Sequence, residues 1–284
     1  MTMESWLRKA ETRLGAGPHP ERARRDAETL LLHLIQRDRA FLIAHPEEAL
    51  SAEGVVRYYA LVERRASGEP LQYITGEQEF YGLPFHVNHN VLIPRPETEG
   101  LVERVLELAA GFARPHIVDV GTGSGAIAVT LAAKLPEATV TAIDISDAAL
   151  AVARTNAERN GVADRIRFTQ GDLLAPFAAG SFEIVVSNPP YVPEADRAML
   201  AVEVRDHEPP MALFAGEDGL AIYRRLIPAA HAVLVSGGWL ALEIGCGQAE
   251  AMEPLLSASG FVEVGFTADL QGILRVAAAQ RPRD

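Results

Sequence analysis

The stretch that decides the fold is residues 116–133, which read HIVDVGTGSGAIAVTLAA. Its first five residues, with apolar Ile117, Val118 and Val120, are typical of a buried strand, and its last eight residues are typical of a helix. The segment Gly121-Thr122-Gly123-Ser124-Gly125 between them predicts a sharp turn from strand to helix. Glycines there let the backbone approach a ligand closely, and the amides of the helix N-terminus face it. We therefore expect a nucleotide-binding βα turn in an α/β fold.

Two aspartates are expected at the same edge of the sheet as this turn. The apolar run 140–143 leads into Asp144, and the run 166–170 leads into Gly171 and Asp172. A carboxylate about twenty residues after such a turn accepts the hydroxyls of a ribose, which we expect of Asp144. We expect Asp172 to accept from an adenine amino group and Leu173 to cover one face of the base. The alternative for each aspartate is N-capping of a helix.

The tetrad Asn188-Pro189-Pro190-Tyr191 closes another strand-like run, residues 182–187. Two consecutive prolines cannot continue a strand ladder, so the backbone after Asn188 is held rigid and nearly extended. The Asn188 side-chain oxygen and the Pro189 carbonyl are expected to accept the two protons of a planar NH2 group, while Tyr191 stacks on its plane. Together with the glycine turn, the tetrad indicates methyl transfer to such a nitrogen. The alternative is a proline-rich turn after a strand.

The glycine turn alone leaves two cofactors open. Gly121, Gly123 and Ala126 also satisfy the dinucleotide fingerprint of NAD-dependent dehydrogenases. However, Asp119 before the turn suits the ammonium of a methionine-like group better than a pyrophosphate, and hydride transfer does not need the tetrad. We therefore expect S-adenosyl-L-methionine, with these residues at its site: Asp119, Gly121, Thr122, Gly123, Ser124, Gly125, Asp144, Asp172, Leu173 and Asn188.

Composition narrows the class of protein. The chain has 284 residues, enough for a large α/β domain and a small companion. It has no long apolar run, and its start lacks the features of a signal peptide, so we expect a soluble cytoplasmic protein. Cys246 is the only cysteine, which excludes an intrachain disulfide and suggests a small buried thiol. The net charge of −12 argues against a broad nucleic-acid footprint, and the scattered histidines indicate no metal site.

The chain divides into three parts by pattern. Residues 1–70 show helical spacing of apolar residues and predict a small helical bundle. Residues 71–95, including Tyr73-Ile74-Thr75-Gly76, carry aromatics and glycines in the rhythm of a β-hairpin linker. Residues 96–284 alternate strands and helices and predict a doubly wound sheet of seven strands. Within them, residues 193–218 are rich in proline and charge and are expected to form a long loop over the strand ends, where loops commonly bind substrate.

These features together resemble the release-factor glutamine methyltransferases, the PrmC/HemK family. The resemblance covers nearly the whole chain and rests on these segments: 68–76, 80–82, 93–99, the Gly121 turn, 188–191, 218–220 and 223–224. It implies an N-terminal helical domain for substrate recognition, a β-hairpin hinge, and a Rossmann-like class I methyltransferase domain whose last strand is antiparallel. Leu173 departs from the family, which often has an aromatic residue there.

The resemblance also implies the reaction. Family members transfer a methyl group from S-adenosyl-L-methionine to the side-chain nitrogen, N5, of the glutamine in the Gly-Gly-Gln motif of peptide chain release factors. It implies that the tetrad of Asn188, Pro189, Pro190 and Tyr191 holds that glutamine. It also implies that Asn188, Pro189 and Tyr191 take part in catalysis. Three alternatives stay open: a ribosomal-protein glutamine as substrate, N6 of DNA adenine as substrate, and a cofactor-binding sensor or scaffold without activity. The DNA alternative lacks a basic target-reading domain.

Overall fold

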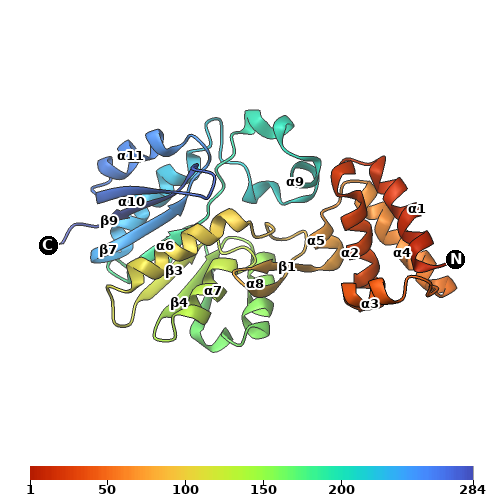
Figure 1. The fold of residues 1–284 in the computed structure, drawn as a ribbon. Coiled ribbons are helices and arrows are strands. Elements are labelled where there is room, and N and C mark those ends of the chain that lie inside the picture. The colour runs from red at the N-terminus through yellow and green to blue at the C-terminus, as the bar shows by residue number, and fades with distance from the viewer. Residues whose placement is uncertain (284) are drawn as a thin grey trace. The chain divides into compact units, whose positions relative to one another are not determined.

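The computed structural model describes residues 1–283, and the chain divides into two compact units (Figure 1). Unit 1 is Met1–Glu77 with Leu200–His207, and unit 2 is Gln78–Met199 with Glu208–Asp284. Unit 1 is therefore discontinuous in sequence, because Leu200–His207 lies far along the chain from Met1–Glu77 and belongs to the same unit.

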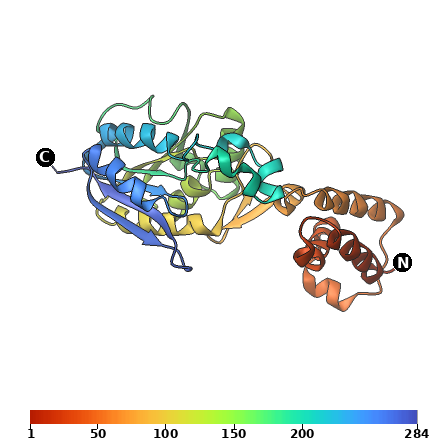
Figure 2. The same ribbon diagram turned by 90° about the horizontal axis from the view of Figure 1, so that it is seen from above.

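Unit 1 is helical. One face of its first helix is apolar, since Met3, Leu7, Ala10 and Leu14 recur at helical spacing and are all buried. They pack with apolar residues of the second and fourth helices in one core cluster. The fourth helix begins at an N-cap, where Ser51 Oγ accepts the Gly54 amide at 3.0 Å. The helices of unit 1 are α1 (Met3–Gly15), α2 (Ala23–Ile35), α3 (Arg39–Ala44), α4 (Ala52–Ala66) and α5 (Leu71–Thr75), which are red to orange in Figure 2, and α9 (Val202–His207), which is teal.

The start of the linker is helical, so our expectation of β structure at residues 73–76 is wrong. Leu71–Thr75 forms the short helix α5, which follows Pro70 and ends at Gly76 with a left-handed φ of 77°. Tyr73 and Ile74 are buried. Such a short helix is not stable by itself, so packing of these two side chains outweighs the strand preference of their residue types. The hairpin itself is present and is shorter, with β1 (Glu77–Phe80) and β2 (Leu83–His86).

A buried arginine holds helix α9 in unit 1. Arg65 of α4 is 3% exposed, and its Nε donates to Asp26 Oδ2 at 2.6 Å. Its Nη1 donates to Glu203 Oε2 of α9 at 2.9 Å and to the Glu69 carbonyl at 3.0 Å. Residues 193–218 are therefore not one open loop, because their middle is a helix paired with unit 1.

Unit 2 is built on a seven-stranded sheet with the order β5-β4-β3-β6-β7-β9-β8. Neighbouring strands are parallel except at β9, which is antiparallel to β7 and β8. The prediction of a doubly wound sheet whose last strand is antiparallel is confirmed. The strands are β3 (His116–Val120), β4 (Thr139–Asp144), β5 (Ile166–Gln170), β6 (Phe182–Ser187), β7 (Leu234–Glu243), β8 (Val262–Ala268) and β9 (Leu274–Gln280).

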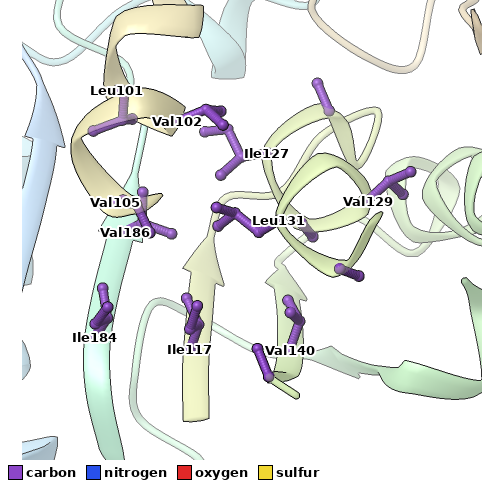
Figure 3. Close-up of a cluster of buried hydrophobic side chains, with 14 of the residues drawn as sticks. Leu101, Val102, Val105, Ile117, Ile127, Val129, Leu131, Val140, Ile184 and Val186 are labelled. Atoms are coloured by element: carbon purple, nitrogen blue, oxygen red, sulfur yellow. The ribbon is translucent and has the colours of Figure 1, made fainter. Parts of the chain in front are cut away.

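Helices cover both faces of the sheet. On one face Ile117 of β3 packs with apolar residues of α6 and α7, as Figure 3 shows for Leu101, Val105 and Leu131. On the other face Val118, the next residue of β3, packs with α10 and α11, which lie together (blue in Figure 2). Strand side chains alternate between faces, so a strand covered on both sides is apolar throughout. The helices are α6 (Glu99–Ala109), α7 (Ala126–Lys134), α8 (Asp147–Arg159), α10 (Ala221–Val233) and α11 (Ala249–Ala258).

The strand order reverses between β3 and β6. Ligands of open α/β sheets bind outside the carboxyl ends of the strands at such a reversal. The glycine turn follows β3 and the tetrad follows β6, so both lie at this position. No helix within residues 1–283 is long and apolar enough to span a membrane.

Candidate active site

The glycine turn adopts a conformation that suits close approach of a ligand. Gly121 and Gly123 have positive φ values of 70° and 54°, and a Cβ at either would meet no protein atom closer than 3.9 Å. The space beside them is therefore open. Gly125 is different, because a Cβ there would lie 3.0 Å from that of Ala153 on α8. Gly121 and Gly123 give access to the backbone, whereas Gly125 permits close packing of two helices.

Asp144 at the end of β4 is attached to the glycine turn. Its Oδ2 accepts the Gly123 amide at 2.9 Å, and its Oδ1 accepts the Ser146 amide at 2.9 Å. Asp144 is half-buried, and Ser146 rather than Asp144 caps helix α8. Each carboxylate oxygen has a second lone pair that remains for a ligand hydroxyl. Its assignment to a ribose stays a prediction.

Asp119 lies beneath the turn and is fully buried. Its Oδ2 accepts from the Thr122 hydroxyl at 2.6 Å and from the Ala128 amide at 3.2 Å. Its Oδ1 has no hydrogen-bond partner within the described chain. Burial raises the pKa of Asp119 to about 7, although the hydrogen bond from Thr122 opposes this. Because its carboxylate supports the turn from below, any contact with a cofactor ammonium remains a prediction.

Asp172 and Leu173 follow β5 as expected, and the structure gives each another contact. Asp172 is exposed and forms an ion pair with Arg225 of α10 at 2.5 Å. Leu173 has a positive φ of 51° and packs against the core cluster that contains Leu174. Their assignments to the adenine amino group and ring stay predictions.

Asn188 directly follows β6, and a hydrogen bond connects this strand end to β3. Ser187 Oγ donates to the Val120 carbonyl at 2.7 Å, which holds the tetrad beside the glycine turn. The Asn188 Nδ2 donates to Thr98 Oγ1 at 3.1 Å. With its NH2 group used in this way, the side-chain oxygen is the end of the amide available to a ligand. Asn188 is half-buried and Pro189 is buried.

Tyr191 is held at both ends. Its hydroxyl donates to Glu243 Oε1 at 3.3 Å, and its carbonyl accepts from Gln248 Nε2 at 3.1 Å. Gln248 Oε1 in turn accepts the Gly245 amide at 2.8 Å. Burial raises the pKa of the Tyr191 hydroxyl, and the Glu243 carboxyl beside it adds to this effect. The ring is therefore neutral at physiological pH and fixed in orientation.

Three residues near the tetrad were missed by sequence reasoning: Thr98, Glu243 and Gln248. Thr98 lies in the 93–99 motif, and Glu243 is the last residue of β7. A glutamate among the apolar residues of a buried strand was the available signal.

Cys246 was expected to be buried and is exposed. No group of three or more His, Cys, Asp or Glu able to hold a metal occurs in the part of the chain that the structure describes.

The residues present fit S-adenosyl-L-methionine. Open space lies beside Gly121 and Gly123, and the Asp144 carboxylate and the unpartnered Oδ1 of Asp119 add hydrogen-bond acceptors at the same end of the sheet. A carboxylate acceptor favours the hydroxyls of a ribose, and acceptors of this kind favour a cationic ammonium and sulfonium. The tetrad lies beside them, and its binding of an NH2 group stays a prediction.

The fold and these strand ends define a class I methyltransferase. A methyltransferase from Pyrococcus furiosus superposes with a TM-score of 0.51 and 18% identity, covering 72% of this chain and 91% of that one. The hMettl16 catalytic domain, in complex with a 3′UTR hairpin, superposes with a TM-score of 0.60 and 18% identity, covering 89% and 88%. At this identity the likeness shows the fold alone.

Sequence comparison gives the family. The PrmC N-terminal domain profile matches residues 5–76, and the methyltransferase small domain profile matches residues 98–204. A release factor glutamine methyltransferase from Koribacter versatilis is 43% identical over 283 residues, 99% of each chain. One from Moorella thermoacetica is 47% identical over 260 residues, 92% of this chain and 91% of its own. The chain belongs to the release factor glutamine methyltransferase family.

Proposed function

We propose that this chain transfers a methyl group from S-adenosyl-L-methionine to N5 of the glutamine in the Gly-Gly-Gln motif of peptide chain release factors. Its full-length relatives carry the name release factor glutamine methyltransferase. The observation that carries the proposal is the bond from Ser187 Oγ to the Val120 carbonyl, 2.7 Å long. It holds the start of an amide-binding tetrad beside the start of a cofactor-binding turn.

The tetrad addresses the chief difficulty of the reaction. An amide nitrogen is a poor nucleophile, because its lone pair is delocalised into the neighbouring carbonyl. We assign Asn188 Oδ1 and the Pro189 carbonyl as acceptors of its two protons, with Pro190 fixing the backbone and Tyr191 stacking on the amide plane. Two acceptors stabilise the positive charge that grows on nitrogen during transfer, which is a transition-state effect.

The cofactor supplies an activated methyl group when it is bound. The protein contributes orientation: Gly121 to Gly125 and Asp144 are proposed to fix the cofactor, so that the glutamine nitrogen meets the methyl group in line. Asp119, Asp172, Leu173 and Asn188 complete the proposed cofactor site. The mechanism needs no dedicated general base, because nitrogen becomes acidic only as the new bond forms.

We assign recognition of the protein substrate to the helical unit at residues 1–77. Its sequence matches the N-terminal domain found in this family, and its helix α9 comes from the segment that follows the tetrad. Our division of the chain at residues 70 and 95 into recognition, linker and catalytic parts belongs to this proposal. We also propose a cytoplasmic location, where release factors act, with no nucleic-acid or membrane partner. The net charge of −12 supports the exclusion of a nucleic-acid partner.

Transfer of labelled methyl groups from S-adenosyl-L-methionine tests the function. The purified chain is incubated separately with release factor, release factor with its Gly-Gly-Gln glutamine changed to alanine, ribosomal proteins and duplex DNA. We expect label in the first substrate alone, and mass spectrometry places it on the glutamine. Label in ribosomal protein or DNA instead would favour those substrates. Cofactor binding without transfer to any of them would favour a sensor or scaffold.

A further inference from the structure

The direction of the Asn188 amide decides whether it works as an acceptor. Its oxygen and NH2 ends have nearly the same shape, so the neighbours determine which end faces a substrate. Thr98 is the neighbour within hydrogen-bond reach, at 3.1 Å from Nδ2. A threonine hydroxyl can both donate and accept, and alone it would tolerate either end of the amide. In the structure the hydroxyl accepts from Nδ2, which leaves Oδ1 facing away from Thr98.

Glu243 anchors the other polar end of the tetrad. Tyr191 Oη donates to Glu243 Oε1 at 3.3 Å, and Thr98 is one of the neighbours that oppose the rise in the pKa of this carboxyl. The tetrad is therefore held by a hydroxyl at Asn188 and by a carboxyl at Tyr191.

The position of Glu243 gives it no other evident purpose. It is 2% exposed at the end of β7, between Leu242 and Ile244, and its Oε2 has no partner among the described residues. Burial raises the pKa of Glu243, while Thr98, Tyr191 and the charge of Arg275 oppose the shift. A buried carboxyl costs stability that an apolar residue would not. Its contribution is thus the orientation of the Tyr191 hydroxyl.

We propose that Thr98 and Glu243 are positioning residues for methyl transfer, which rests on the function assigned above to Asn188. Thr98 accepts from the NH2 end of Asn188 and so selects the conformation whose oxygen faces the substrate amide. Glu243 accepts from the Tyr191 hydroxyl and fixes the ring. Two residues outside the tetrad therefore hold its two polar ends.

Thr98→Val tests the first step, because valine keeps the shape and removes the hydroxyl. We expect kcat for release factor to fall about 10- to 100-fold, the range for residues that orient a functional group, with cofactor affinity unchanged. Thr98→Ser should restore most of the activity, since it keeps the oxygen. Thr130→Val is the matched control, because Thr130 is fully buried on α7 and its hydroxyl has no partner in the described chain.

A double-mutant cycle separates positioning from a general structural role. If Thr98 acts through Asn188, Thr98→Val should have little further effect on kcat once Asn188 is alanine. Glu243→Leu should resemble Thr98→Val, whereas Glu243→Gln keeps an acceptor oxygen and should lose less. Additive losses of Thr98→Val and Asn188→Ala, or a loss equal in Thr98→Val and Thr98→Ser, would overturn the proposal.

The wild type separates this inference from the function on which it rests. If the wild-type chain transfers no methyl group to release factor, the proposed function is ruled out. If the wild type is active and a folded Thr98→Val variant is equally active, only the positioning role is ruled out. If Thr98→Val fails to bind cofactor or unfolds, the comparison of Glu243→Gln with Glu243→Leu decides between the two outcomes.

Discussion

The Gly123 amide donates a 2.9 Å hydrogen bond to Asp144 Oδ2, which joins the turn after β3 to the carboxylate that ends β4. Residues from two strands therefore form one rigid edge of the proposed cofactor site. The backbone bonds from the Gly121 and Thr122 amides to the Ile143 carbonyl, at 2.8 and 3.1 Å, reinforce this edge. Loss of the carboxylate should affect both the ligand contact and the turn.

Asp144→Ala should weaken binding of S-adenosyl-L-methionine by about 1.5 to 3 kcal/mol, the contribution of a hydrogen bond to a charged group. Titration calorimetry of the folded variant measures this. Asp164→Ala is the control, because Asp164 is exposed in the turn before β5, at the opposite end of the strand from Asp172. Equal affinity for the wild type and Asp144→Ala would remove Asp144 from the cofactor site.

Asp119 should make stability depend on pH. Its pKa is about 7 in the folded chain and near 4 when unfolded, so between these values the folded state binds the extra proton. Stability is then lost as pH rises, by up to about 1.4 kcal/mol per pH unit, until both states are ionised above pH 7. Urea unfolding from pH 4.5 to 8 should show wild type losing stability relative to Asp119→Asn. Parallel profiles would show that burial does not shift this carboxyl.

Arg65→Ala should destabilise unit 1 by about 3 to 5 kcal/mol, because it leaves the Asp26 carboxylate buried without its partner. Arg13→Ala provides the comparison in the same unit. The Arg13–Glu63 pair is exposed and screened by solvent, so its loss should change stability little. Thermal unfolding followed by circular dichroism measures both. A similar small loss in the two variants would mean that Arg65 is not an essential partner for Asp26.

Removal of residues 1–77 should reduce turnover of release factor far more than cofactor binding. The variant needs glycine and serine in place of Leu200–His207, because this segment otherwise loses its packing partners. A full-length chain with only that replacement separates the two effects. Equal turnover of release factor by the truncated and replaced chains would assign substrate recognition to unit 2 alone.

The α/β core could be predicted because its signals are local. The run 116–125 contains a strand and its turn, and Asp144 follows the next strand at the expected spacing. The pairing of Arg65 with Glu203 could not be predicted, since 138 positions separate the two residues and the intervening chain gives no signal of contact. The prediction of β structure at residues 73–76 was wrong because aromatic and β-branched residues favour strands. Burial of Tyr73 and Ile74 stabilises a helix there instead.

The sequence indicated which residues of the candidate site stand at the strand ends, and it did not indicate the residues that support them. Asn188 and Tyr191 stand in a distinctive tetrad, so their roles follow from the chemistry of their side chains. Thr98 and Glu243 lie far from the tetrad in the sequence, and only the fold brings them to it. Support of this kind depends on tertiary packing, which a single sequence does not display.

The most direct measurement is the rate of methyl transfer to release factor by Asn188→Ala compared with wild type. The variant loses the acceptor for one amide proton, so kcat should fall by about a hundredfold or more, and cofactor affinity should fall by less. Release factor with its Gly-Gly-Gln glutamine changed should receive no methyl group from either enzyme. Wild-type rates from Asn188→Ala, or transfer to the glutamine-changed factor at the wild-type rate, would contradict the assignment of the tetrad to this glutamine.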